Sequence, residues 1–461
     1  MRNPLPRRRK CGHDDRPPLL KSSRPRPRFF FLILFDIFAI SQILIYILND
    51  CAFMPLNDIL KKIDDSRDDI TRDLMDMIRI PAIGPANGGV GEGERADYLI
   101  TLLKGFDDVK RVDVDDEDYP GIKRPSILAT KKGKRAGTVW IIAHMDTVLP
   151  GDLTKWVHPP YEPHLEDGKV YGLGAEDNGQ AVLASIYASR FFKDIELNGR
   201  SLGIALVSDE ETTSNMGIGY LVKNGYFSKD DVIIVPDWGS PGSSMIDVSE
   251  KHLLWVKVSV KGKQTHGSTP NKGLNAYRVG ARFLTELLED LDERYGKEND
   301  LFKPSRSTFE PTKCSSTVGN VNTIPGYHEF WIDCRIIIDY DPNEIFDHMV
   351  SFAKRFSEET KAEIIVEKEQ LTFSGRASST ESEGYKVFKE SINYVTGIDV
   401  TAAGIGGGTC ANFFRLEGLD AYVWESEGGS LHQPNEFVKI DSIVTDAKVY
   451  ATLFYRLCVN N

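Results

Sequence analysis

The sequence contains few cysteines and lacks the paired spacing of a redox or zinc motif. Its six cysteines are scattered through 461 residues, and no two of them stand in a Cys-x-x-Cys arrangement. Such a distribution indicates buried or free thiols and excludes a disulfide framework. The chain also has no internal repeat.

Over most of the chain, Lys and Arg do not outnumber Asp and Glu. The formal net charge is -12, although residues 1–28 carry ten Lys or Arg and only two Asp. The remaining residues therefore hold about -20, which excludes a nucleic-acid-binding body and predicts no nucleic-acid partner. Hydrophobic residues make up 41% and aromatic residues 10% of the chain. This composition excludes a disordered or fibrous protein, and the length predicts two or three domains.

Only one long hydrophobic run occurs, at residues 29–48, and Asp36 is its single charge. Twenty residues in a helix span about 30 Å, the thickness of a bilayer core, so residues 1–53 read as a basic segment with a single membrane-spanning helix. A secretory signal is disfavoured because the basic region is long and no small-residue cleavage pattern follows. The alternative is that translation starts at Met54, which predicts a cytoplasmic protein instead of a single-pass membrane protein.

The body alternates short apolar runs with segments of helical spacing. Helices are expected over 57–80 and 96–106, and buried strands over 138–143, 202–207 and 232–235. Strands that alternate with helices predict an α/β fold, in which a mostly parallel sheet is covered by helices on both faces. We assign this catalytic domain to residues 54–250 and 375–461.

The rhythm changes between residues 251 and 374, where the order becomes β-α-β-β-α-β. This order is typical of a ferredoxin-like α+β arrangement, in which two helices cover one antiparallel sheet. The simplest interpretation is a small domain inserted into the larger one. Its expected strands are 252–260, 315–321, 329–338 and 362–368, and its expected helices are 276–291 and 343–359.

Each of the three predicted strands of the larger sheet ends in polar residues that could act as ligands. The first is followed by His144 and Asp146, the second by Glu210 and Glu211, and the third by Asp237. In an open α/β sheet, ligands bind outside the carboxyl ends of the strands. Three such endings that converge predict one site.

The residue types in this set point to metal ions. Crowded carboxylates repel one another unless a cation lies among them. Asp177, at a loop-to-helix junction, and His432 could join them. Mixed imidazole and carboxylate ligands suit zinc, cobalt or manganese. Two histidines and at least three acids are too many for one open zinc site, so two metals that share a carboxylate fit better.

Local geometry suggests further roles. Asp146 stands two residues after His144, so it can accept the second ring N–H of that histidine and fix its tautomer. Glu210 and Glu211 would point in opposite directions within a strand, so they belong in the loop beyond it. One of the two can then bind metal while the other serves as general base.

Together these motifs resemble the acetylornithine deacetylase / succinyl-diaminopimelate desuccinylase / carboxypeptidase family of dinuclear zinc metallopeptidases, and within it an uncharacterised metallohydrolase of the archaeal type. The steps of 33 residues from His144 to Asp177 and from Asp177 to Glu210 match the family's spacing, and the resemblance extends from residue 57 to the C-terminus. The resemblance implies that Asp177 bridges two metals. It places His144 and Asp237 at one metal and Glu211 and His432 at the other. It also makes Glu210 the general base and Asp146 the hydrogen-bond partner of His144.

The family also implies functions for the inserted domain, which serves there as a lid and usually as the dimer interface. His266 resembles the histidine that reaches the site of the neighbouring subunit and stabilises the oxyanion. Asn322 and Arg335 resemble the pair that holds a substrate carboxylate. The chain is therefore expected to form a homodimer through residues 251–374.

The glycine-rich loop before Thr409 matches the desuccinylase pattern, and it makes Thr409 a candidate substrate-binding residue. Cys410 and Ala411 stand where Ser-Asp is usual, which argues against diaminopimelate as the substrate. Phosphate binding is disfavoured because the loop lacks the Gly-Lys-Ser/Thr ending of a P-loop.

The sequence thus predicts a hydrolase that uses two divalent metal ions, zinc or else cobalt or manganese. Its expected substrates are N-acyl amino acids or short peptides, which leaves deacylase and peptidase both open. The alternative is a non-catalytic binding protein that retains the fold. A membrane partner is expected only if residues 29–48 belong to the native chain.

Overall fold

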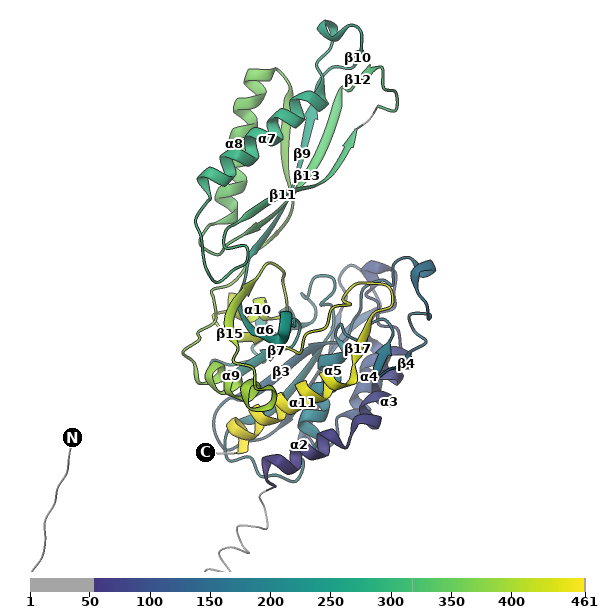
Figure 1. Cartoon of the computed structure of the whole chain (residues 1–461), viewed down its shortest axis with the longest axis vertical. Coiled ribbons are helices and arrows are strands. Elements are labelled where there is room, and N and C mark those ends of the chain that lie inside the picture. The colour runs from purple at the N-terminus through teal and green to yellow at the C-terminus, as the bar shows by residue number, and fades with distance from the viewer. Residues whose placement is uncertain (1–53, 317, 460–461) are drawn as a thin grey trace, which may run out of the picture. The chain divides into compact units, whose positions relative to one another are not determined.

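The computed structural model describes residues 54–316 and 318–459, and these residues form an eight-stranded sheet (Figure 1). Strands β6, β3, β7 and β16 pair in parallel in that order, as do β15 and β8, whereas β1, β2 and β6 pair antiparallel at one edge. The predicted α/β class with a mostly parallel sheet is confirmed. In spatial order the strands are β1 (Asp108–Asp115), β2 (Lys123–Lys131), β6 (Ser201–Val207), β3 (Thr138–His144), β7 (Val232–Val235), β16 (Ala421–Val423), β8 (Met245–Glu250) and β15 (Thr401–Ile405).

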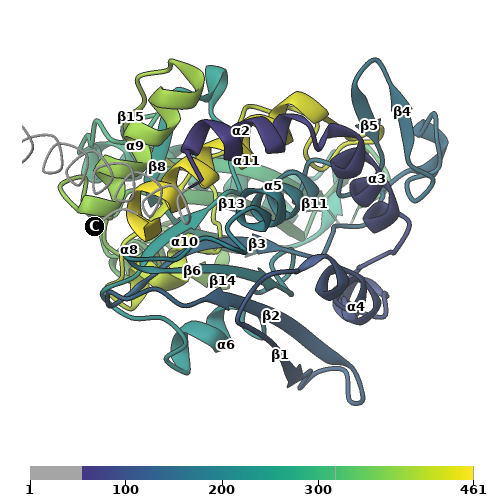
Figure 2. The same ribbon diagram turned by 90° about the horizontal axis from the view of Figure 1, so that it is seen from below.

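Both faces of this sheet are covered, and this is why its central strands are apolar throughout. Along β3, Val139 and Ile141 pack into one hydrophobic core, and Trp140 and Ile142 into the other. In Figure 2, α3, α5 and α11 lie on one side of β3 and β6, and α6 lies on the other. The covering helices are α2 (Leu56–Asp64), α3 (Arg67–Ile78), α4 (Gly93–Leu102), α5 (Gly179–Arg190), α9 (Glu383–Thr396) and α11 (Ile440–Phe454) on the first face, and α6 (Ile218–Lys223) and α10 (Ala411–Leu416) on the second.

A second sheet lies between β8 and β15 in the chain and has a core of its own. It is antiparallel, with the order β11-β13-β9-β14, and α7 and α8 pack on one of its faces (Figure 1). This is the strand order of a ferredoxin-like β-α-β-β-α-β unit. Its elements are β9 (His252–Lys261), α7 (Ala276–Arg294), β11 (Thr308–Ser316), β13 (Tyr327–Ile336), α8 (Pro342–Thr360) and β14 (Glu363–Thr372).

Local sequence signals explain where the helices of this second unit begin and end. The side chain of Asp341 caps α8 by accepting a hydrogen bond from the N–H of Asn343, and Pro342 occupies the first helical position. Lys361 ends the helix in a left-handed conformation. The buried residues of α8 recur every three or four positions, so its apolar side faces the sheet: Ile345, Met349, Ala353 and Phe356.

Shorter elements complete the fold. They are β4 (His164–Glu166), β5 (Lys169–Tyr171), β17 (Phe437–Lys439), β10 (Thr265–His266), β12 (Thr323–Ile324), the 3₁₀ turns Pro85–Asn87, Leu153–Lys155, Pro241–Ser243 and Pro270–Lys272, and a π-helical turn, Tyr455–Val459.

Some elements differ from the sequence-based expectation. The helix expected over 57–80 is interrupted at Asp65 and Ser66, and it forms the two helices α2 and α3. The strand expected at 315–321 is β11, which ends at Ser316; most of its residues are exposed, so its pattern is weak. The antiparallel strands β1 and β2 were not expected, because the charged residues of β1 conceal its alternation.

Among the described residues, no helix combines the length and the apolar content that a membrane span requires. The segment 29–48, for which a membrane-spanning helix is predicted, lies outside the described residues.

Candidate metal centre

The polar strand endings meet at one edge of the large sheet. Strand β3 lies between β6 and β7, and all three run parallel, so their carboxyl ends are neighbours. His144 is the last residue of β3, Glu210 and Glu211 follow β6, and Asp237 follows β7. The convergence expected from the sequence is therefore present in the fold.

Asp177 lies between the two histidines. Its Oδ1 atom is 2.8 Å from Nε2 of His144, and its Oδ2 atom is 3.1 Å from Nε2 of His432. Nε2 of His144 is also 3.4 Å from Oδ1 of Asp237, and Nε2 of His432 is 3.2 Å from Oε2 of Glu211. A single carboxylate thus contacts two separate imidazoles, each of which has a second carboxylate beside it.

These five residues form two overlapping groups that could each hold a metal ion. In one group, ligand atoms of His144, Asp177 and Asp237 lie within 4.8 Å of one another, and in another those of Asp177, Glu211 and His432 do so. The two groups share Asp177. A third group of the same size joins His144 to Glu210 and Glu211. Because the donors are imidazole nitrogens and carboxylate oxygens, the set fits zinc, cobalt or manganese.

The electrostatics of the cluster favour bound cations. Burial together with the charge of Asp237 raises the pKa of Glu210 well above its ordinary value, and burial also raises the pKa of Glu211. Hydrogen bonds to Asp177 and Glu211 raise the pKa of His432 to about 10. The acids outnumber the imidazoles that could balance them, so divalent cations would relieve the repulsion among the carboxylates.

Asp146 contacts more than the sequence suggested. Nδ1 of His144 lies 3.2 Å from the backbone carbonyl oxygen of Asp146 and 3.5 Å from its carboxylate. The two carboxylate oxygens accept hydrogen bonds from the backbone N–H groups of Glu210, at 3.1 Å, and Glu211, at 3.0 Å. Asp146 therefore supports both the ring of His144 and the turn that carries the two glutamates.

Two buried acids that the sequence analysis missed connect the loops of Asp177 and His432. Glu436 accepts hydrogen bonds from the N–H groups of Gly174, Glu176 and Asp177. In return, Glu176 accepts them from the N–H groups of Gly429 and Ser430, two residues before His432. Each acid stands close in sequence to a predicted ligand, and this proximity was the one signal available.

A further residue missed by the sequence analysis orients Asp237. Nδ2 of Asn178 donates hydrogen bonds to the backbone oxygen of Pro236, at 2.8 Å, and to Oδ1 of Asp237, at 3.0 Å. Asn178 directly follows Asp177, so one short segment carries the carboxylate that contacts both histidines and the amide that orients Asp237.

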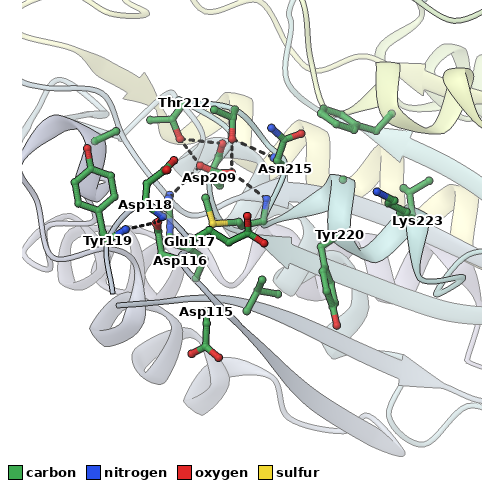
Figure 3. A pocket seen from close by; sticks show the side chains of 18 of the residues that line it. Asp115, Asp116, Glu117, Asp118, Tyr119, Asp209, Thr212, Asn215, Tyr220 and Lys223 are labelled. Atoms are coloured by element: carbon green, nitrogen blue, oxygen red, sulfur yellow. Dashed lines mark hydrogen bonds and ion pairs between the residues drawn. The ribbon is translucent and has the colours of Figure 1, made fainter. Parts of the chain in front are cut away.

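The turn that holds Glu210 and Glu211 is fixed from its other side by Asp209. Its carboxylate accepts hydrogen bonds from the hydroxyl groups of Thr212 and Thr213, and the buried Arg124 lies 3.1 Å from its Oδ1 atom. A cavity of about 520 Å³ adjoins this turn (Figure 3), and the acidic run 115–118 is part of its lining. The cavity is lined by Asp209 and Thr212 but by none of the predicted metal ligands.

A larger cavity, of about 940 Å³, opens beside Glu210 and brings together three predicted residues. Glu210, Arg335 and Thr409 all line it. The guanidinium of Arg335 donates to both oxygens of Asp333 and to the backbone oxygen of Gly406, so part of its hydrogen-bonding capacity is already used. The hydroxyl of Thr409 donates to Oε1 of Glu250, at 2.8 Å.

His266 and Asn322 lie next to each other, and His266 belongs to none of the potential metal-binding groups of the described residues. His266 ends β10, which pairs with β12, and Thr323 is its direct partner there. The N–H of Gly267 donates to the backbone oxygen of Asn322. The side chain of His266 is exposed and contacts Ser268 through Nδ1. The structure therefore brings the predicted ligands together, whereas the contacts found for these two residues are with each other's segments and with Ser268.

Comparisons with known proteins identify the relatives of this chain. Residues 140–456 match peptidase family M20/M25/M40. An uncharacterised metallohydrolase of Methanocaldococcus jannaschii is 38% identical over 398 residues, which cover 81% of this chain and 96% of that protein. A succinyl-diaminopimelate desuccinylase of Methylococcus capsulatus is 26% identical over 346 residues, which cover 72% of this chain and 86% of the relative.

Solved structures agree with the fold. A dipeptidase of Saccharomyces cerevisiae superimposes with a TM-score of 0.66 at 17% identity, and the match covers 87% of this chain and 98% of that one. At this level of identity, the likeness shows that the two chains share a fold.

Proposed function

This chain belongs to peptidase family M20/M25/M40 and is a metallohydrolase that acts on peptide or amide bonds, and we propose that it cleaves N-acyl amino acids or short peptides with two divalent metal ions. The proposal depends chiefly on one observation, the position of Asp177. Its two oxygens contact His144 and His432 separately, at 2.8 and 3.1 Å. A carboxylate in this position can bridge two metals.

In the proposed site, Asp177 would be shared by the two ions, His144 and Asp237 would hold one ion, and Glu211 and His432 would hold the other. When bound, two such ions polarise the substrate carbonyl and make water a stronger acid. Zinc suits these donors best, and cobalt and manganese are also compatible with them.

Glu210 acts as the general base in this proposal. It removes a proton from the attacking water and then delivers that proton to the leaving nitrogen. Its burial raises its pKa above the ordinary value of a glutamate, the direction that makes the carboxylate a stronger base. Asp146 keeps the glutamate in place by accepting the backbone N–H of Glu210.

We assign residues 251–374 to a lid that also forms a dimer interface, and residues 54–250 and 375–461 to the catalytic domain. The exposed His266 then completes the site of the other subunit, where it stabilises the oxyanion. Arg335, Asn322 and Thr409 are proposed to bind the substrate. Arg335 and Thr409 line the cavity beside Glu210, which supports this role for two of the three.

A substrate panel tests the proposed function. The metal-loaded protein is incubated with N-acetyl and N-succinyl amino acids and with di- and tripeptides, and bound metal is measured by elemental analysis. We expect two equivalents of metal and release of a free amino acid from at least one class. Purified protein that retains no transition metal, or that leaves every amide intact when loaded, would contradict the proposal.

A further inference from the structure

A third cavity, of about 720 Å³, borders the glycine-rich loop and is lined mainly by apolar side chains. Trp238 packs against one hydrophobic core of the large sheet and Leu301 against the other, yet each keeps part of its surface exposed. The volume is within the range of cavities that hold small ligands. The apolar residues of the lining include Trp238, Pro241, Met245, Leu301, Ala402 and Ile405.

The wall that Leu301 forms is held against the large sheet. The backbone oxygen of Leu301 accepts a hydrogen bond from the N–H of Gly404 in β15, at 2.7 Å. A Cβ atom on Gly404 would lie 2.4 Å from the ring of Phe302, so this close approach requires glycine. Phe302 itself is 1% exposed. The cavity is therefore a feature of the packed fold.

Asp237 connects this apolar cavity to the predicted metal centre. It belongs to the lining, and its Oδ1 atom is 3.4 Å from Nε2 of His144. The cavity of about 940 Å³ beside Glu210 shares residues 407–409 of the glycine-rich loop with the apolar cavity. The ligand cluster is thus bordered by one cavity at Glu210 and by another at Asp237, and residues 407–409 form a wall common to both.

The walls of the two cavities differ in charge. Lys251 and Arg335 line the cavity beside Glu210, and such cations suit a substrate carboxylate. In the apolar cavity, the charged side chains among the described residues are, apart from the predicted ligand, Asp300 and Lys303, and both are exposed. The first cavity therefore matches the charged half of an N-acyl amino acid, and the second matches an apolar half.

We propose that the apolar cavity binds the acyl group of the substrate, so that the preferred substrates are amino acids N-acylated with an apolar group larger than acetyl. This inference rests on the proposed hydrolytic function and narrows its substrate class. The two substituents of a trans amide point away from each other. When the substrate carboxylate lies in the cavity of Arg335 and the amide lies at the ligand cluster, the acyl group is directed toward Asp237. An acyl chain in this place removes apolar surface from water, which favours binding.

The same lining disfavours an acyl group that ends in a carboxylate. Lys303 is its one cation within residues 54–316 and 318–459, and Lys303 is exposed. A carboxylate that enters the cavity would lose water without gaining a buried positive partner there, which is costly. A succinyl group should therefore bind less well than a butanoyl group of the same length.

A series of N-acyl-leucines tests the inference, because its members differ only in the acyl group. Acetyl, butanoyl and hexanoyl lengthen the chain by two methylenes at each step, and succinyl matches butanoyl in length. For the metal-loaded enzyme, we expect kcat/KM to rise by about ten- to hundredfold from acetyl to hexanoyl, below the limit of about fourfold for each buried methylene. The value for the succinyl compound should be about tenfold or more below that for the butanoyl compound.

Met245→Gln places a polar group of similar size in the apolar wall, at a partly buried position at the start of β8. The gain from acetyl to hexanoyl should fall by about fivefold or more, through KM, while N-acetyl-leucine is largely unaffected. Leu416→Gln is the matched control, because Leu416 lines the cavity beside Glu210 but not the apolar cavity. This variant should keep the gain. A gain that is lost in Leu416→Gln and kept in Met245→Gln would place the acyl group in the other cavity and overturn the inference.

Binding separates this inference from the proposed hydrolysis. The affinities and heat-capacity changes of the same four compounds are measured by calorimetry on the zinc-loaded Glu210→Gln variant, with and without Met245→Gln. An affinity that rises with acyl length and depends on Met245, with an increasingly negative heat-capacity change, supports the inference even if the enzyme cleaves none of the compounds. In that case only the proposed function fails. Equal affinities from acetyl to hexanoyl overturn the inference even if every compound is cleaved.

Discussion

Oε1 of Glu436 accepts a hydrogen bond from the backbone N–H of Asp177 at 2.9 Å, across 259 residues of sequence. The relationship is reciprocal, since Glu176, the neighbour of Asp177, accepts the N–H of Ser430 near the other ligand loop. A Cβ atom on Gly428 would lie 1.7 Å from Oε1 of Glu176, so the close approach of the two loops requires glycine there. The loops of Asp177 and His432 therefore hold each other in place through these hydrogen bonds.

Removal of Glu436 should disturb the metal site although Glu436 is not a ligand. In Glu436→Ala, three backbone N–H groups lose their acceptor, which should lower the free energy of unfolding by about 3 kcal/mol. The displaced Asp177 should lower zinc affinity by about ten- to hundredfold, as is usual when the support of a ligand is lost. Urea denaturation and zinc titration measure the two effects.

Glu166→Ala is the control for this variant, because Glu166 is an exposed acid of β4 and should change neither quantity. If Glu436→Ala binds zinc as tightly as the wild type does, Glu436 does not position Asp177.

Metal stoichiometry should separate the shared ligand from the others. In His432→Ala, one of the two predicted sites loses its imidazole, so we expect about one metal equivalent to remain per chain. In Asp177→Ala, both sites lose a carboxylate, so we expect both equivalents to be lost or greatly weakened. Elemental analysis after gel filtration provides the count.

His164→Ala is a suitable control for the stoichiometry, since His164 stacks on His158 and belongs to none of the potential ligand groups of the described residues. Two full equivalents in Asp177→Ala would show that Asp177 does not bridge.

The grouping of the candidate ligands could be predicted from the sequence because several of them stand at the ends of buried strands. His144, Glu211 and Asp237 follow buried strands whose apolar runs are unmistakable, and parallel pairing brings such strand ends together. Buried strands appear in a sequence as apolar runs, so the point at which each strand ends can be read from the sequence. The α/β class followed from the same signal.

The supports of these ligands could not be predicted because long-range hydrogen bonds leave no periodic signal. Glu176 and Glu436 resemble solvated loop acids in the sequence, yet both are buried. The spacing of Asp146 from His144 indicated a shared face, but it could not reveal that the carboxylate binds the backbone of Glu210. The role of His266 was assigned from a family resemblance, because an exposed histidine that contacts only its own loop carries no signal of it in the sequence.

Glu210→Gln tests the base separately from the metal ligands. Glutamine has the same shape but cannot accept a proton, so turnover should fall by about a hundred- to ten-thousandfold while metal content stays unchanged. In Glu211→Gln, by contrast, the content of bound metal should fall. Steady-state kinetics and elemental analysis of both variants decide the assignment, and unchanged turnover in Glu210→Gln would remove Glu210 from the role of base.

The buried Asp446 should make stability depend on pH. Burial raises its pKa from 3.8 to about 7, against the hydrogen bonds from Ser426 and Gln180. Between pH 4 and 7, the folded state therefore keeps a proton that the unfolded chain has lost, so the free energy of unfolding should fall as the pH rises through this range. Asp446→Asn removes this titration.

We therefore expect the stability of the wild type relative to Asp446→Asn to be lower at pH 8 than at pH 5, as measured by urea denaturation. Asp68→Asn, at an exposed position of α3, should follow the wild type at both values. A difference that does not change with pH would show that Asp446 is already ionised throughout.

Complementation between two inactive variants tests whether His266 acts on the neighbouring subunit. His266→Ala should lower kcat by about a hundred- to thousandfold, the usual cost of losing one group that stabilises an oxyanion. If His266 acts across a dimer, a mixed dimer of His266→Ala and Glu210→Gln chains contains one complete site, because one chain supplies Glu210 and the other His266. After subunit exchange in an equal mixture, about a quarter of the wild-type activity should return, since half of the dimers are mixed and each has one working site.

An equal mixture of Asp177→Ala and Glu210→Gln chains is the control and should remain inactive. Asp177 and Glu210 of one site come from the same chain, so neither site of a mixed dimer is complete. If the first mixture is also inactive although exchange is complete, His266 serves the site of its own chain. Full activity of the His266→Ala variant alone would show instead that His266 has no part in the reaction.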